Sequence, residues 1–282
     1  MSVNANANAT TPPRPTLAKV PEITVLFWVL KLLTTGMGEA MSDFLGQHSV
    51  PIAAAIGLLG LGLALHLQLR QTEYRATHYW FAVMMVAVFG TMAADGIHDG
   101  ANVGYDVTAP VFGAATAAIF WAWYRTEGTL SIHTITTRRR ERFYWLAVLS
   151  TFALGTAAGD LTATQVGLGF WSSALLFAAL MAVPAIGWYR FGWNPILSFW
   201  IAYVLTRPLG ASFADGFSKN FGGGLGLGDG VVSAVTLATF AALVGYAHYT
   251  KADVQAQGDL HPHHSPAPSP HTSPVVTYEP AE

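Results

Sequence analysis

One spacing of four residues recurs along the whole chain. An aromatic residue is followed at once by tryptophan, then by glycine eleven positions and aspartate sixteen positions after the aromatic residue. Each copy lies in an apolar segment of about 20 residues, the length that a helix needs to cross a bilayer. This recurrence predicts a repeat protein built from membrane-spanning helices. The four copies are Phe27, Trp28, Gly38 and Asp43; Tyr79, Trp80, Gly90 and Asp95; Tyr144, Trp145, Gly155 and Asp160; and Phe199, Trp200, Gly210 and Asp215.

The composition also indicates a membrane protein. Hydrophobic residues make up 52% of the chain and charged residues 11%, whereas about 25% of a soluble domain is charged. The lipid bilayer is therefore the expected surroundings of most of the chain. The absence of cysteine excludes disulfides and thiolate metal sites. A net charge of -2 does not indicate a nucleic-acid partner, and we expect none.

Apolar stretches between residues 22 and 251 predict an all-α polytopic bundle of eight transmembrane helices. Spans that carry the motif alternate with spans that carry almost no charge, so the repeating unit is a helical hairpin. Because each unit has two spans, all units share one orientation and the repeats are parallel. The units cover about 22–73, 74–138, 139–193 and 194–251, and the spans are approximately 23–45, 51–69, 78–97, 109–124, 143–161, 170–188, 195–217 and 230–249.

The distribution of basic residues predicts the orientation. Eleven of the 14 Lys and Arg residues lie before the first span, after the last, or in loops that follow the uncharged spans. The positive-inside rule then predicts that both termini lie in the cytoplasm. The expected location of the protein is the inner membrane of the cell. Residues 1–21 and the His-, Pro- and Ser-rich residues 252–282 read as disordered tails. The eleven are Arg14, Lys19, Arg70, Arg75, Arg125, Arg138, Arg139, Arg140, Arg142, Arg190 and Lys251.

Acidic residues inside apolar spans are the candidate functional groups, because a carboxylate is costly there. The four motif aspartates share one depth, about 24 Å along the helix from the aromatic residue. One turn before the aspartate, three copies carry a second oxygen ligand on the same helix face. Carboxylate and hydroxyl oxygens suit hard cations such as Mg²⁺, Ca²⁺ or Mn²⁺, or a proton relay. The predicted cation path is Glu39, Asp43, Thr91, Asp95, Thr156, Asp160 and Asp215.

Two further groups of residues extend this prediction. His98 and Asp99 follow Asp95 by three and four positions, so they form either part of a site for Mn²⁺ or Zn²⁺ or a solvated helix entrance. Lys31 and Arg207 are cations within the first and last motif spans. They need acidic partners, and a substrate cation or a proton can displace them from those partners.

The glycines and tryptophans of the motif have a structural explanation. Glycine near the middle of a span lets neighbouring helices approach closely. Tryptophan at the start of a span is typical of an anchor at the membrane interface. In the C-terminal tail, His261, His263, His264 and His271 form a cluster that can bind metal or remain solvated.

Three segments resemble a known family. They are residues 20–22 leading into Phe27 and Trp28, residues 151–160, and residues 199–212. They are similar to a bacterial family of uncharacterised membrane-anchored proteins built from four copies of a two-helix repeat of unknown function. The resemblance covers about residues 19–251. It implies an integral inner-membrane bundle and brings no activity with it.

These observations favour a membrane transporter of a cation, with a divalent metal such as manganese as the leading substrate and proton coupling as an option. Two alternatives remain open. One is a scaffold or sensor whose arginines between residues 138 and 142 bind anionic lipid or a partner. The other is a proton-coupled organic-solute carrier. The sequence contains no HExxH, GxSxG or P-loop motif, so we expect no enzyme and no cofactor. A homo-oligomer is compatible with this interpretation.

Overall fold

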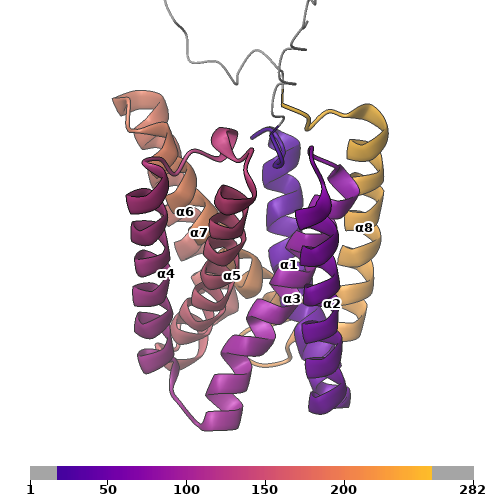
Figure 1. The fold of residues 1–282 in the computed structure, drawn as a ribbon. Helices are drawn as coiled ribbons and strands as arrows, with labels where there is room; N and C mark the ends of the chain where they lie inside the picture. The colour runs from indigo at the N-terminus through magenta and orange to yellow at the C-terminus, as the bar shows by residue number, and fades with distance from the viewer. Residues whose placement is uncertain (1–17, 256–282) are drawn as a thin grey trace, which may run out of the picture.

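Every apolar stretch of the sequence forms a helix in the computed structural model, which describes residues 18–255 (Figure 1). Short connections join the helices, and no strand occurs within the described range. An all-helical bundle is therefore confirmed. The elements are α1 (Val25–His48), α2 (Val50–Arg70), α3 (Ala76–Ala101), α4 (Tyr105–Glu127), η1 (Ile132–Thr134), α5 (Arg138–Asp160), η2 (Leu161–Gln165), α6 (Phe170–Phe191), α7 (Pro195–Ser218) and α8 (Asp229–Thr250).

Seven of these helices are long and apolar enough to cross a membrane, namely α2 to α8. The chain is thus a helical membrane protein. α1 has the required length but carries Lys31, Glu39 and Asp43, which lower its mean hydropathy. The first two of these side chains are buried inside the protein rather than turned toward lipid.

The helices that carry the motif form a closed inner ring. α1 packs against α3, α3 against α5, α5 against α7, and α7 against α1. The remaining helices lie outside, and each packs mainly on the motif helix that follows it in the ring: α2 on α3, α4 on α5, α6 on α7, and α8 on α1. The four helices of the inner ring therefore surround a common axis, and α8 packs against α1 in the outer layer.

The motif glycines explain how the ring closes so tightly. A Cβ added to any of them would collide with the neighbouring motif helix, so only glycine permits this separation. In every case the residue touched is the one eight positions after the aromatic residue of the next copy. Gly38 faces Ala87, Gly90 faces Phe152, Gly155 faces Arg207, and Gly210 faces Thr35.

The interpretation of the motif tryptophans as interfacial anchors is wrong for three of them. Trp80, Trp145 and Trp200 are buried in the core, because the outer helices cover the starts of the motif helices. The indole of Trp200 donates a hydrogen bond to the carbonyl oxygen of Leu130 at 2.9 Å. These side chains stabilise the ring from inside the protein.

Both ends of the described chain pack against one end of the bundle, which we call the terminal end. Val20 and Lys19 are already buried, although they fall within the predicted N-terminal tail. The Lys19 ammonium donates to Glu141 at 2.8 Å. Asp253 is also buried, and its carbonyl oxygen accepts from the Glu22 amide at 2.8 Å. Residues 1–17 and 256–282, with the histidine cluster, lie outside the described residues.

Side-chain caps start three of the four motif helices, and the strongest is Asn194 before α7. Its Oδ1 accepts from the amides of Ile196 and Leu197 at 2.9 and 3.2 Å. Replacing Asn194 by alanine leaves two amides without this acceptor, so we expect the free energy of unfolding to fall by about 1 kcal/mol. Denaturant titration in detergent measures the change. An unchanged midpoint would show that water caps α7 equally well.

Candidate cation site

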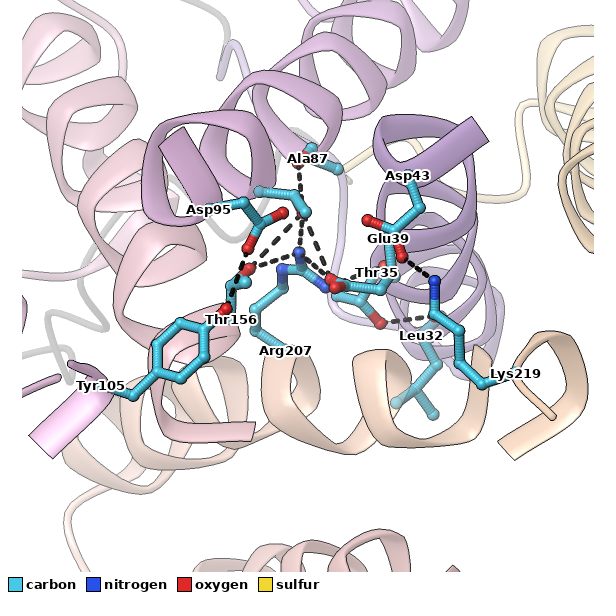
Figure 2. Close-up of polar contacts among 11 residues, drawn as sticks. Leu32, Thr35, Glu39, Asp43, Ala87, Asp95, Tyr105, Thr156, Arg207 and Lys219 are labelled. Atoms are coloured by element: carbon cyan, nitrogen blue, oxygen red, sulfur yellow. Dashed lines mark hydrogen bonds and ion pairs between the residues drawn. The ribbon is translucent and has the colours of Figure 1, made fainter. Parts of the chain in front are cut away.

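Arg207 lies on the axis of the ring and joins all four motif helices (Figure 2). Its Nη1 donates to the carbonyl oxygen of Thr35 at 3.0 Å. Its Nη2 donates to Glu39 Oε2 at 2.6 Å, to Thr156 Oγ1 at 2.7 Å and to the hydroxyl of Thr91. The side chain is 1% exposed. One guanidinium from α7 thereby binds polar groups of α1, α3 and α5.

The sequence positions this guanidinium through the repeat itself. Arg207 stands eight positions after its motif aromatic residue, where it faces Gly155 of the preceding copy. A Cβ on Gly155 would lie 2.2 Å from Cγ of Arg207, so the glycine makes the space that the arginine stem occupies. The side chains that accept from Arg207, those of Glu39, Thr91 and Thr156, stand one turn further along their own helices, on the same face.

Beyond Arg207, the motif acids converge on one cavity of about 870 Å³. Oxygen atoms of Glu39, Asp43 and Asp95 lie within 4.8 Å of one another. Oxygen atoms of Glu39, Asp160 and Asp215 form a second such group, and Glu39 belongs to both. The end of the bundle that holds this cavity is called the acidic end below. Each of the four helices of the inner ring thus contributes one aspartate to a shared space.

Asp215 is the motif acid whose surroundings point most directly to a ligand. Its side chain is 4% exposed and lines the cavity. Within residues 18–255, its Oδ1 has no hydrogen-bond partner. A buried carboxylate oxygen without a donor is costly, whereas a cation in the cavity would neutralise it.

Two local features shape the other acids. Tyr105, at the start of α4, places its hydroxyl 3.5 Å from Asp95 Oδ1. Directly after Asp160 the backbone changes from α-helix to the π-helical segment η2. Such π-helical turns occur frequently at functional sites, because the inserted residue re-aims side chains.

Lys219 closes one side of the cavity. Its ammonium donates to Asp43 Oδ2 at 2.5 Å and to Asp229 Oδ1 at 3.1 Å. Burial by itself would lower the pKa of Lys219, but the negative charges of Asp43, Asp215 and Asp229 outweigh this and raise the pKa above its usual value. Because the folded pKa is raised, the contribution of Lys219 to stability is complete below its unfolded pKa and is lost only at higher, strongly alkaline pH.

Lys219 and Asp229 were not among the predicted site residues. The sequence contained a signal for Lys219. The loops that follow the motif spans contain no other lysine or arginine. Asp229 follows a glycine-rich stretch and starts α8, so its sequence position alone resembles a helix cap. Its contact with Lys219, and with Gln47 at 2.5 Å, depends on the closing of α8 against α1.

His98 and Asp99 also line the cavity. The imidazole of His98 stacks on Tyr105 with ring centroids 3.8 Å apart. Its Nδ1 lies 2.9 Å from the carbonyl oxygen of Val103. Neither residue belongs to the two groups of close ligand atoms found among the described residues. Their part in binding a metal stays a prediction.

The two buried cations have different surroundings. Arg207 has the acidic partner that the sequence called for, in Glu39. Lys31 does not, because its Nζ has no hydrogen-bond partner within the described range. The expectation that Lys31 pairs with an acidic partner is therefore wrong. Its side chain ends among aromatic rings, one helical turn closer to the terminal end than Arg207.

A family of known sequences matches the chain in three places. The Repeat of Unknown Function (DUF347) matches residues 78–129, 143–192 and 198–253. These ranges cover more than half of the chain and coincide with the second, third and fourth predicted units, so internal repetition is confirmed. The first unit is not among the matched residues. No curated protein and no solved structure matches the chain.

Proposed function

The chain belongs to the family defined by the Repeat of Unknown Function (DUF347), and we propose that this member carries a small cation across a membrane. The observation that carries the proposal is the shared cavity. Asp43, Asp95, Asp160 and Asp215 come from four helices of the ring and gather at one end of its axis with Glu39. Acids that only capped helix ends would point outward to solvent at separate places.

The donor atoms favour a hard divalent cation. The two ligand groups contain only carboxylate oxygens, and the hydroxyls of Thr91 and Thr156 lie beside them. Oxygen ligands suit Mg²⁺, Ca²⁺ and Mn²⁺, and we take Mn²⁺ as the leading candidate. The two sets of close ligand atoms share Glu39. They therefore provide two successive binding positions for one ion along the path.

Arg207 provides the barrier on this path. Its guanidinium is bonded to Glu39, the residue that belongs to both sets of close ligand atoms. A divalent cation that binds Glu39 must therefore displace the guanidinium or draw Glu39 away from it. Exchange between these two states is the step at which transport is controlled.

The proposed topology includes α1 as an eighth span, because it belongs to the inner ring and its charged face is turned inward. In this topology four parallel hairpins surround the path, and the first hairpin is a diverged copy of the repeat. The positive-inside rule places the terminal end in the cytoplasm of a bacterial cell and the acidic end outside its inner membrane.

Two alternatives lead to different experiments. The cavity, at about 870 Å³, lies within the size range that holds small organic molecules, so an organic cation is the second candidate substrate. A scaffold that binds lipid through the arginines at the start of α5 has less support. Arg140 Nε donates to Glu127 at 2.8 Å, and Arg139 donates to the same carboxylate, so these two charges are already paired within the protein.

Removing single charges from the cavity tests the proposal. In proteoliposomes that enclose a fluorophore quenched by Mn²⁺, we expect Asp215→Asn and Asp160→Asn to lower the initial rate of Mn²⁺ uptake by about ten- to hundredfold. The asparagine keeps the size of the side chain but loses the anionic ligand, and changes at metal sites produce losses of this order.

The matched control is Asp106→Asn. Asp106 is an exposed acid in the first turn of α4, at the same end of the bundle, and its carboxylate does not line the cavity. Its uptake rate should equal that of the unchanged protein. Equal rates in all three variants would reject the ion path. Uptake of amines without uptake of Mn²⁺, Mg²⁺ or Ca²⁺ would favour the organic cation.

A further inference from the structure

Lys31 is a buried amine that the acidic cavity does not use. Its side chain is 1% exposed. Within residues 18–255, its Nζ has no hydrogen-bond partner. A charged ammonium in such a place is costly, and an inert position in the core would be filled more stably by an apolar side chain. The residue therefore requires a chemical explanation.

The surroundings of Lys31 connect it to Arg207. Its Nζ lies 3.8 Å from the centre of the Phe152 ring and 4.1 Å from that of Tyr203. The guanidinium carbon of Arg207 lies 5.3 Å from the centre of the same Phe152 ring. Two cations thus share one aromatic ring, in a region from which water is largely excluded. Their mutual repulsion is strong there, because little solvent screens it.

Several titratable groups face Lys31 from the helices packed on α1, and none of them is a free carboxylate. α7 contributes Tyr203, whose ring lies beside the Lys31 ammonium, and Arg207, while Tyr79 of α3 and Tyr144 of α5 belong to the same buried cluster as Tyr203. The hydroxyls of Tyr79 and Tyr144 bond each other. α2 has no titratable side chain before His66, and α8 has none between Asp229 and Tyr246. Glu39, two turns further along α1, is held by Arg207.

We propose that Lys31 binds the proton that is exchanged for the transported cation. This inference rests on the proposed function. Without the cation, Glu39 neutralises Arg207, and the faces of the Phe152 and Tyr203 rings hold Lys31 as an ammonium. When a divalent cation takes Glu39, the charge of Arg207 loses its partner. One N–H bond of Lys31 then breaks, the electron pair stays on nitrogen, and the proton passes to water.

Counting protons tests this exchange. Mn²⁺ is added to the purified full chain in weakly buffered detergent solution, and a pH indicator reports the protons released. Carboxylates release protons as well, so the informative quantity is the difference between variants. Lys31→Met should release about one proton per bound Mn²⁺ fewer than the unchanged protein, and its affinity for Mn²⁺ should depend less on pH.

Lys31→Arg supplies the opposite case, because arginine keeps its charge at all accessible pH values. It should bind Mn²⁺ at least about tenfold more weakly, since its charge cannot be released. Lys251→Gln, at an exposed lysine after α8, is the matched control and should release as many protons as the unchanged protein. Lys31→Gln provides a second neutral side chain if the methionine variant does not fold.

The outcomes separate the two proposals. If the unchanged protein neither binds nor carries Mn²⁺ or another cation, the proposed function fails. If Mn²⁺ binds and Lys31→Met releases as many protons as the unchanged protein, only the role of Lys31 is overturned. A proton count lowered in Lys31→Met and kept in Lys251→Gln supports the exchange.

Discussion

Replacing Arg207 by methionine is expected to lower the free energy of unfolding by about 3–5 kcal/mol, the range observed when one partner of a buried ion pair is removed. Methionine reproduces the aliphatic stem of the arginine, so the main loss is that of the charged guanidinium. Glu39 would keep a buried charge without its guanidinium, and the hydroxyls of Thr91 and Thr156 would lose their charged donor. Denaturant titration in detergent, followed through the fluorescence of the buried tryptophans, measures the effect.

A double variant separates charge from packing. Arg207→Met combined with Glu39→Gln removes both charges, so the loss should be smaller than for Arg207→Met alone. If the loss came from packing alone, the two changes would add. An Arg207→Met protein as stable as the unchanged chain would show that Glu39 is neutral or hydrated, and would contradict the central pair.

The second large effect is expected at the closest contact of the ring. In Gly210→Ala, the new Cβ would lie 1.8 Å from Oγ1 and 2.6 Å from Cβ of Thr35, and 3.0 Å from the amide nitrogen of Gly36. Thr35 cannot turn away without losing its hydrogen bond to Leu32, whose carbonyl oxygen accepts at 2.6 Å. α1 and α7 must separate, and we expect the free energy of unfolding to fall by about 3 kcal/mol.

Gly62→Ala is the matched control for this substitution. Gly62 lies in α2, and nothing lies within 4 Å of an added Cβ there. Alanine should leave the free energy of unfolding unchanged or raise it by up to about 1 kcal/mol, because it restricts the unfolded chain. Equal effects at Gly210 and Gly62 would show that the ring does not depend on helix contact at the motif glycines.

Much of the architecture could be predicted because membrane helices follow simple rules. The length and low charge of each span can be read from neighbouring residues, and the repetition can be read from the spacing of the motif. Together they predicted helices close to those of the structure. The predicted role of glycine in close packing agrees with the contacts of Gly38, Gly90, Gly155 and Gly210. The tryptophans were misjudged because interfacial and buried indoles occupy the same place in the sequence. Only the positions of the outer helices distinguish them.

The candidate site shows a similar division. Equal spacing predicted that the four aspartates share one depth, and their gathering around a single cavity agrees with the ring that their helices form. The sequence did not predict which charged side chains pair with each other. Arg207 forms an ion pair with Glu39, whereas Lys31 contacts the rings of Phe152 and Tyr203. The two cations nevertheless occupy similar positions in the sequence pattern. Lys219 and Asp229 entered the site through contacts between distant segments.

By itself, then, the sequence determined the class of protein, the internal repeat and the height of each acid along its helix, because these follow from the spacing and polarity of its residues. Only the tertiary structure decided which helices form the inner ring and which charged side chains form ion pairs inside it. It also placed Lys31 among aromatic rings rather than beside an acidic residue. Those outcomes depend on how four similar helices rotate and approach one another. A rotation of one helix changes which side chains face the axis while leaving every local pattern intact.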